Sequence, residues 1–174
     1  MAYPRTIGTD AAVILFSGGR EVFSSQEPLL RALGTPHYAG ADAGLAAISD
    51  AALLAFSFAT VAGFLYGANV SRAAGIDFAD YLALADPFFN TFITEAVDET
   101  AERIVESHFG EAQSSTETDV AAIELLIVAA SRDVGVDPAL MAAVSDAFRR
   151  IVAAGRGDEA IAALADLDIS RLAP

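Results

Sequence analysis

Residues 41–75 read ADAGLAAISDAALLAFSFATVAGFLYGANVSRAAG, and this stretch decides the fold. No proline interrupts it, and Gly75 followed by Ile76-Asp77 is a stop signal, so the pattern predicts one long helix from Ala41 to about Gly75. At 1.5 Å per residue, such a helix is about 50 Å long. Because it is apolar on all sides, a second protein surface has to cover it. The simplest such surface is another copy of the chain.

The same stretch raises the alternative of a membrane span. From Ala51 to Val70 it carries no charged side chain, and it is long enough to cross a bilayer as a helix. However, it contains Ser57, Thr60 and Asn69 and follows directly after Asp50. We therefore favour a helix that is buried by protein, and we expect no membrane partner.

Composition and charge narrow the class of protein. The 174 residues are 54% apolar and 20% charged, which is typical of a globular protein. The net charge of −14 disfavours nucleic acid as a partner. The absence of lysine excludes Schiff-base catalysis, and the absence of cysteine excludes thiolate chemistry. Since Met1 to Arg5 lack the features of a signal peptide, we expect a cytoplasmic protein.

The first 40 residues resemble the tail of an α/β unit. A strand is predicted at 12–16, a turn at 17–19, a helix from Arg20 to about Leu33, and a second short strand at 37–39, after Pro36. We therefore predict two domains. Residues 1–40 form a residual Rossmann-like strand-helix-strand segment, and residues 41–174 form the long helix with a helical dimerisation and substrate domain.

The rest of the chain is predicted to be helical, so the fold class is mainly α. The helices are expected at 78–85, 87–108, 119–134, 138–154 and 158–167. Thr118 or Asp119 is the predicted N-cap of the third of these. The carboxylates of the second, among them Glu95 and Glu99, are interpreted as a solvated stripe.

Metal and nucleotide motifs are weak. His37 and His108 are the only histidines and lie far apart, so we predict no metal site. Residues 155–160 match G-x-G-x-x-A, but they follow a predicted helix rather than a strand, and Asp158 and Glu159 would repel a pyrophosphate. We therefore predict no cofactor. Three tyrosines could present a hydroxyl to a cavity, and nothing in the sequence chooses among them: Tyr38, Tyr66 and Tyr81.

Asp50 is the most conspicuous polar residue of the long helix. It is the only charged side chain between Asp42 and Arg72. A carboxylate inside an apolar helix is costly to bury unless it is paired, and removal from water favours the protonated form that a general acid needs. The alternative is that Asp50 binds an amine, an arginine of another subunit or solvent near the helix start.

Read in order, several stretches resemble the imine reductase and reductive aminase family. They are residues 1–4, 7–9, 12–18, 44–54, 130–132, 135–137 and 152–155. The resemblance covers nearly the whole chain. It implies a Rossmann domain, a long interdomain helix and a helical domain, with two interlocked subunits that share each active site. The family's glycine-rich NADPH loop would precede Met1.

The resemblance also implies roles for individual residues. Asp50 matches the acid that, in many members, donates a proton to the imine nitrogen or orients it. Phe58 matches a position where many members carry a tyrosine, Phe88 matches an aromatic that shapes the substrate pocket, and Asp119 matches the start of a site-lining helix. We predict Asp50 as the catalytic residue, and Leu54, Phe58, Phe88 and Asp119 as substrate-binding residues. Core packing is the alternative for both phenylalanines, and a helix cap is the alternative for Asp119.

Three functional hypotheses remain open. The first is a cofactor-independent enzyme, a homodimer that uses Asp50 in an apolar cavity for a cyclisation, isomerisation or condensation of a small apolar or imine-bearing substrate. The second is a non-catalytic partner subunit of a split or mixed NADPH-dependent imine reductase. The third is a truncated product without activity of its own, because half a parallel sheet leaves unpaired edges.

Overall fold

The computed structural model describes residues 5–170, the last three by their backbone only. Met1 to Pro4, which contribute to the resemblance, lie outside the described residues. The chain divides into two compact units, residues 1–62 and 63–174, and each is described here by itself. The two domains predicted on either side of residue 40 stay a prediction.

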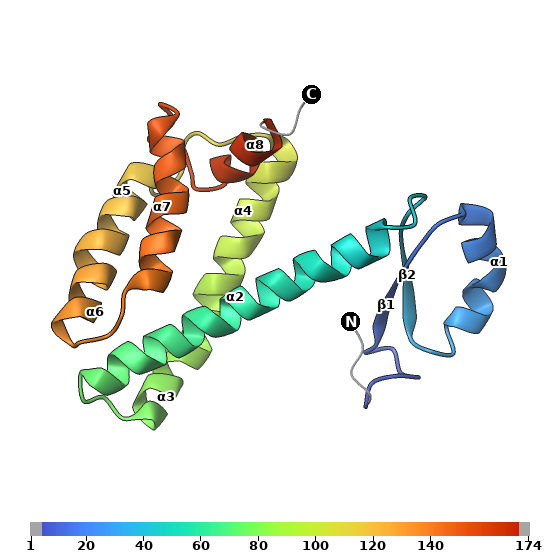
Figure 1. Ribbon diagram of the computed structural model, residues 1–174, viewed down its shortest axis with the longest axis horizontal. Coiled ribbons are helices and arrows are strands. Elements are labelled where there is room, and N and C mark those ends of the chain that lie inside the picture. The colour runs from blue at the N-terminus through green and yellow to red at the C-terminus, as the bar shows by residue number, and fades with distance from the viewer. Residues whose placement is uncertain (1–4, 171–174) are drawn as a thin grey trace. The chain divides into compact units, whose positions relative to one another are not determined.

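The N-terminal unit contains a two-stranded parallel sheet. Strand β1 (Val13–Ser17), helix α1 (Arg20–Leu30) and strand β2 (Thr35–Gly40) follow one another, and the sheet pairs Val13 with Thr35 (Figure 1). The strand-helix-strand prediction is confirmed. The second strand is longer than predicted and includes Pro36, which a strand with a free edge tolerates because one side of it needs no N–H donor.

Aromatic packing and two hydroxyl groups hold this unit together. Phe23 of α1 packs on Phe16 and on Tyr38, with ring centroids 6.0 and 5.1 Å apart. The Tyr38 hydroxyl donates to the carbonyl of Gly18 at 2.7 Å. The Ser17 hydroxyl donates to the carbonyl of Ala43 and accepts from the Ala46 amide, so it fixes the chain where the next helix begins.

Helix α2 (Leu45–Ala73) is the long helix that the sequence predicts. It begins after a turn in which Asp42 accepts a hydrogen bond from the Gly44 amide, and its end is followed by Gly75 with φ +86°. Among the described residues, it is the one helix long and apolar enough to cross a membrane, and 0% of its most apolar stretch is buried. Many of its apolar side chains are therefore exposed, among them Leu53, Phe56 and Val61.

After the last turns of α2, the C-terminal unit continues with one helix built of three parts: α3 (Phe78–Phe88), the π-helical η1 (Phe89–Ile93) and α4 (Thr94–Glu106). The predicted break between residues 85 and 87 is wrong, because Pro87 lies inside α3. Pro87 has no N–H for the carbonyl of Ala83, so that bond of α3 is absent, and the π-helical turn begins two residues after the proline.

A second continuous helix consists of α5 (Thr116–Ala122), the π-helical η2 (Ile123–Val128) and α6 (Ala129–Asp133). It begins earlier than predicted, and its N-cap is Ser115, whose hydroxyl accepts from the Thr118 amide at 3.3 Å. The prediction of Thr118 or Asp119 as the cap is therefore wrong. Both lie inside the first turn, because the serine three residues upstream already satisfies the amides there.

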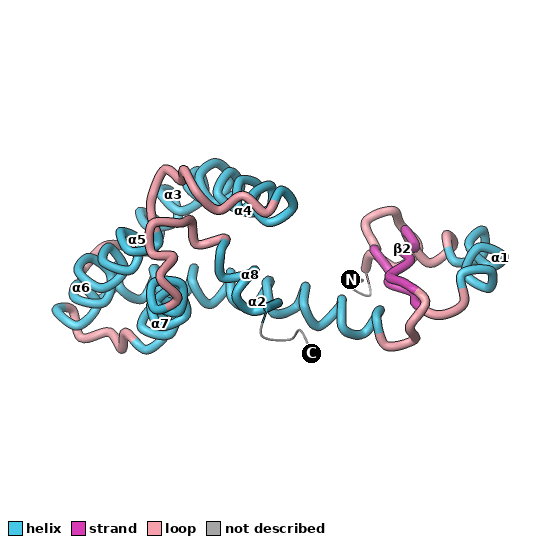
Figure 2. Tube along the Cα trace, turned by 90° about the horizontal axis from the view of Figure 1, so that it is seen from above, coloured by secondary structure: helices cyan, strands magenta, loops and turns pink. Residues whose placement is uncertain are grey.

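Two further helices complete the unit, α7 (Ala139–Ala153) and α8 (Ala163–Ser170). Residues 158–162, predicted as helix, form a turn instead. Their backbone groups form hydrogen bonds with residues far away in the sequence. The Ala160 amide donates to the Phe109 carbonyl, and the Glu159 carbonyl accepts from the Thr116 amide. Helices α5 and α7 lie side by side, and α8 lies near the end of α4 (Figures 1 and 2).

The core of the C-terminal unit combines Ile151 of α7 with three buried hydroxyls. Ser131 donates to the Ile127 carbonyl and pairs with the Tyr66 hydroxyl at 2.5 Å, which fastens α2 to α6. Ser145 donates to Glu124 at 2.8 Å. The hydroxyls of Tyr38, Tyr66 and Tyr81 are thus all engaged within the chain, since Tyr81 donates to the Phe64 carbonyl and burial raises its pKa.

Candidate functional site

A cavity of about 620 Å³ lies within the C-terminal unit. Its walls come from α4, the loop that follows it, the helix from α5 into η2, α7 and the turn before α8. The volume falls in the range of small-molecule sites. Its apolar lining consists of Phe92, Ala96, Ala112, Ala122, Ile123, Ile127, Phe148, Ala160 and Ile161, and its polar lining of Glu95, Glu99, Thr100, Arg103, Gln113, Ser114 and Asp119.

Carboxylates dominate the charge of the cavity wall. Arg103 pairs with Glu99 at 2.9 Å, and Asp119 accepts a hydrogen bond from the Ser114 hydroxyl at 2.6 Å. Glu95 adds a third carboxylate against the single guanidinium. Glu95 and Glu99 are exposed, as the sequence predicts for a solvated stripe, and both also line the cavity. Such a wall favours a cationic or amine-bearing ligand over an anion.

Two of the predicted substrate-binding residues are close to this cavity. Asp119 lines it directly. Phe88 is 54% exposed and stacks on Phe92, with ring centroids 4.8 Å apart, and Phe92 is part of the lining. Phe88 is therefore not buried in the core of the chain, and it contacts the cavity lining only through Phe92.

The other three predicted residues lie in the N-terminal unit, on α2. Asp50, Leu54 and Phe58 follow one another at intervals of four residues, so they share one face of the helix. Asp50 is half-buried, and no side chain of residues 5–167 pairs with it. Phe58 is 71% exposed. That these three residues line a substrate cavity stays a prediction.

Comparison with known proteins places the chain in a family. Residues 42–168 match the family described as NADPH-dependent reductive aminase-like, C-terminal domain. The chain belongs to the imine reductase and reductive aminase family. The matched range contains α2 and nearly all of the helical unit, so it includes Asp50, Leu54, Phe58 and every residue that lines the cavity.

Individual relatives of this imine reductase family agree in sequence and in fold. An NADPH-dependent reductive aminase of Aspergillus oryzae is 29% identical over 168 residues, which are 94% of this chain and 56% of that protein. A reductive aminase of Aspergillus terreus, solved with NADPH and ethyl levulinate, is 35% identical with a TM-score of 0.82, and the match covers 96% of this chain and 58% of that one. An imine reductase of Myxococcus stipitatus, solved with NADP+, is 26% identical with a TM-score of 0.86, and covers 95% and 58%. The chain thus spans 56–58% of the length of these relatives.

The glycine-rich match near the C-terminus does not have the form of a dinucleotide-binding loop. The G-x-G-x-x-A match at residues 155–160 follows helix α7, and a Cβ at Gly157 would meet Val152 at 3.5 Å. Arg156, between the two glycines, is already paired with Glu159 and Asp166, and these hydrogen bonds raise its pKa. No group of three or more metal-ligating side chains comes together within residues 5–170.

Several residues of the cavity escaped the sequence analysis. Phe92, Arg103 and Ser114 carry no motif, and their roles depend on how α4 and the loop after it fold back on η2. A signal existed for Phe92 alone, because it lies four residues after Phe88 and therefore on the same side of a helix.

Proposed function

We propose that this chain is the helical, substrate-binding and self-associating part of an imine reductase fold, and that it acts on a small apolar or imine-bearing molecule in a cavity at the interface of a homodimer. The observation that carries the proposal is the uncovered apolar helix α2 in a chain that also holds an acid-lined cavity of about 620 Å³. Two copies that pack against each other along α2 bury the apolar side chains of this helix. In such a dimer, Asp50, Leu54 and Phe58 of one copy face a surface of the other copy, and the two surfaces together enclose the proposed site.

If α2 forms the dimer interface, a charged side chain introduced on α2 should weaken dimerisation. Val61, on α2, is 52% exposed, so Val61→Arg is expected to leave the fold of the chain intact. In the dimer the arginine has to be desolvated, and we expect the dissociation constant to rise on the order of a hundredfold. Sedimentation equilibrium measures this change.

The matched control is Glu102→Arg, an exposed position on the polar side of α4, one turn from Asp98 and Glu106. It adds the same side chain to a helix surface that is already charged, and dimerisation should stay unchanged. A chain that is monomeric before any substitution, or equal weakening by both variants, would argue against α2 as the interface.

The chemistry we propose is acid catalysis without a nucleotide: a cyclisation, isomerisation or condensation. One relative has been solved with cyclohexanone and allyl amine. A ketone and an amine condense to a carbinolamine, which loses water to give an imine, and the second step needs a proton on the departing hydroxyl. Asp50 is the proposed donor of that proton, and its carboxylate takes back the proton that the nitrogen releases. In the overall reaction, one ketone and one amine give one imine and one water molecule.

We expect Asp50→Asn to slow imine formation about a hundredfold, because an amide cannot donate an acidic proton. The assay mixes the purified protein with cyclohexanone and allyl amine in the absence of nucleotide and traps the imine with cyanoborohydride. Asp42→Asn is the control, since that asparagine still accepts the hydrogen bond from Gly44. Equal rates for the unchanged protein and Asp50→Asn would remove Asp50 from the mechanism.

A second candidate function is that of a partner subunit in a mixed NADPH-dependent imine reductase. The N-terminal unit favours it, because Val22 and Leu29 of α1 are 67% and 68% exposed beside a sheet of two strands. Native mass spectrometry of the purified chain distinguishes the two. A stable homodimer supports the first proposal, and a monomer that pairs only with a nucleotide-binding subunit supports the second.

A further inference from the structure

The loop between α4 and α5, residues 107–115, forms one wall of the cavity. It contributes Ala112, Gln113 and Ser114 to the lining, and Ser114 donates its hydroxyl to Asp119 at 2.6 Å. Glu111 has φ +53°, a left-handed conformation that side-chain-bearing residues adopt at a cost. The loop therefore does not hold this shape through its own preferences, and contacts from outside have to fix it.

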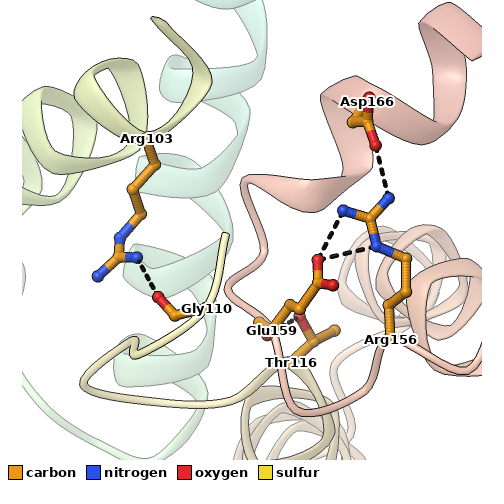
Figure 3. Close-up of polar contacts among 6 residues, drawn as sticks. All are labelled: Arg103, Gly110, Thr116, Arg156, Glu159 and Asp166. Atoms are coloured by element: carbon orange, nitrogen blue, oxygen red, sulfur yellow. Dashed lines mark hydrogen bonds and ion pairs between the residues drawn. The ribbon is translucent and has the colours of Figure 1, made fainter. Parts of the chain in front are cut away.

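Those contacts come from both sides of the loop. From α4, the Arg103 guanidinium donates to the carbonyl of Gly110 at 2.8 Å. From the turn before α8, the Ala160 amide donates to the carbonyl of Phe109 at 2.8 Å. Thr116, just after the loop, donates its hydroxyl to the carbonyl of Glu159 at 2.7 Å (Figure 3). The turn before α8 thus binds the chain at Phe109 and at Thr116, which lie before and after the loop residues that line the cavity.

Arg156 organises this turn without lining the cavity itself. Its guanidinium donates to Glu159 at 2.8 Å and to Asp166 of α8 at 2.6 Å, so it ties the turn to the last helix (Figure 3). The same guanidinium lies 5.3 Å from the centre of the Phe109 ring, at the beginning of the loop. One side chain therefore joins the turn, the loop and α8.

We propose that Arg156 is a positioning residue. It holds residues 109–116, which are most of this loop and the first residue of α5, against the cavity, and so sets how tightly the cavity binds its ligand. This inference rests on the proposed function, because it takes the cavity as the place where the ligand binds. Arg156 acts through Phe109, Glu159 and the backbone bonds of the turn, and it does not touch the ligand.

The test compares Arg156→Gln with the unchanged full chain by two measurements. Hydrogen exchange of the amides in residues 109–116 should speed up on the order of tenfold, while the amides around Ile151 in α7 keep their protection. The affinity for dibenz[c,e]azepine, a ligand of one solved relative, should fall by roughly the same factor in calorimetry. Arg156→Lys should partly restore both the slow exchange and the affinity, because lysine keeps the positive charge but lacks the planar guanidinium that donates to two carboxylates at once.

Arg149→Gln is the matched control, because it also removes an arginine with two ion pairs, to Glu124 and Asp146, away from the loop. It should leave exchange in residues 109–116 unchanged. Unchanged exchange there in Arg156→Gln, or an equal rise in α7, would overturn the proposal, and so would the same effect in the control. If the unchanged protein binds no dibenz[c,e]azepine, the proposed function fails in that respect, and the exchange comparison still decides the role of Arg156.

Discussion

Replacing Gly34 with alanine is expected to destabilise the β1–α1–β2 segment by at least about 3 kcal/mol. Gly34 has φ +154°, and a Cβ there would lie 2.3 Å from the carbonyl oxygen of Ala12. That oxygen accepts the amide of Thr35 at 2.7 Å, so it cannot move away without breaking the first bond between the strands. Hydrogen exchange of the β1 and β2 amides, measured against urea concentration, gives the change in free energy.

Gly19→Ala is the control for this prediction. The backbone at Gly19 has φ −59°, and the nearest atom to an added Cβ is a methyl group of Val22 at an ordinary 3.6 Å. An alanine therefore fits, and the free energy of unfolding should change by less than about 1 kcal/mol. Similar losses in both variants would mean that glycine flexibility in general, rather than the contact with Ala12, explains the effect.

Truncating Ile151 to alanine is expected to lower the free energy of unfolding of the C-terminal unit by about 3–5 kcal/mol. Ile151 is 0% exposed and is the largest fully buried side chain among the described residues. The variant loses the transfer energy of its methyl and methylene groups and leaves a cavity in α7, which packs on both α5 and η2. Urea unfolding followed by circular dichroism measures the change.

Leu140→Ala tests whether burial is the cause. Leu140 lies in the first turn of the same helix and is 38% exposed, so its truncation should cost about 1 kcal/mol or less. Equal destabilisation by the two substitutions would contradict the assignment of Ile151 to the core.

The elements that the sequence predicts best are those with strong local signals. The strand-helix-strand order before residue 40 follows from a short apolar run, a pair of glycines and Gly34. The long helix follows from the unbroken stretch that Gly75 ends. In both cases the chemistry that sets the boundary lies within a few residues of it, so a local pattern suffices.

The errors arise where distant contacts decide. Pro87 reads as a helix start, yet the helix runs through it into a π-helical turn. Residues 158–162 have helical composition, but Thr116 and Phe109 take up their backbone groups. A local pattern cannot foresee a partner more than 40 positions away.

The candidate site shows the same limit. Asp119 and Phe88 are predicted as substrate-binding residues from the family resemblance alone; Asp119 lines the cavity, and Phe88 stacks on Phe92, which also lines it. Arg103 and Ser114 were missed because they act by closing a loop, which leaves no periodic trace in the sequence. Asp50, Leu54 and Phe58 lie in the predicted long helix at intervals of four residues, and their roles in catalysis and substrate binding stay predictions.

The two π-helical turns, η1 and η2, give this fold a tolerance to changes in chain length. Each contains one residue more than an α-helical turn needs, at 89–93 and at 123–128. A single deletion within either turn would restore α-helical bonding and leave every later side chain facing the same way. The same deletion within α7 would rotate the residues that follow by about 100°. Insertions and deletions of one residue among relatives are therefore expected to gather at these two turns.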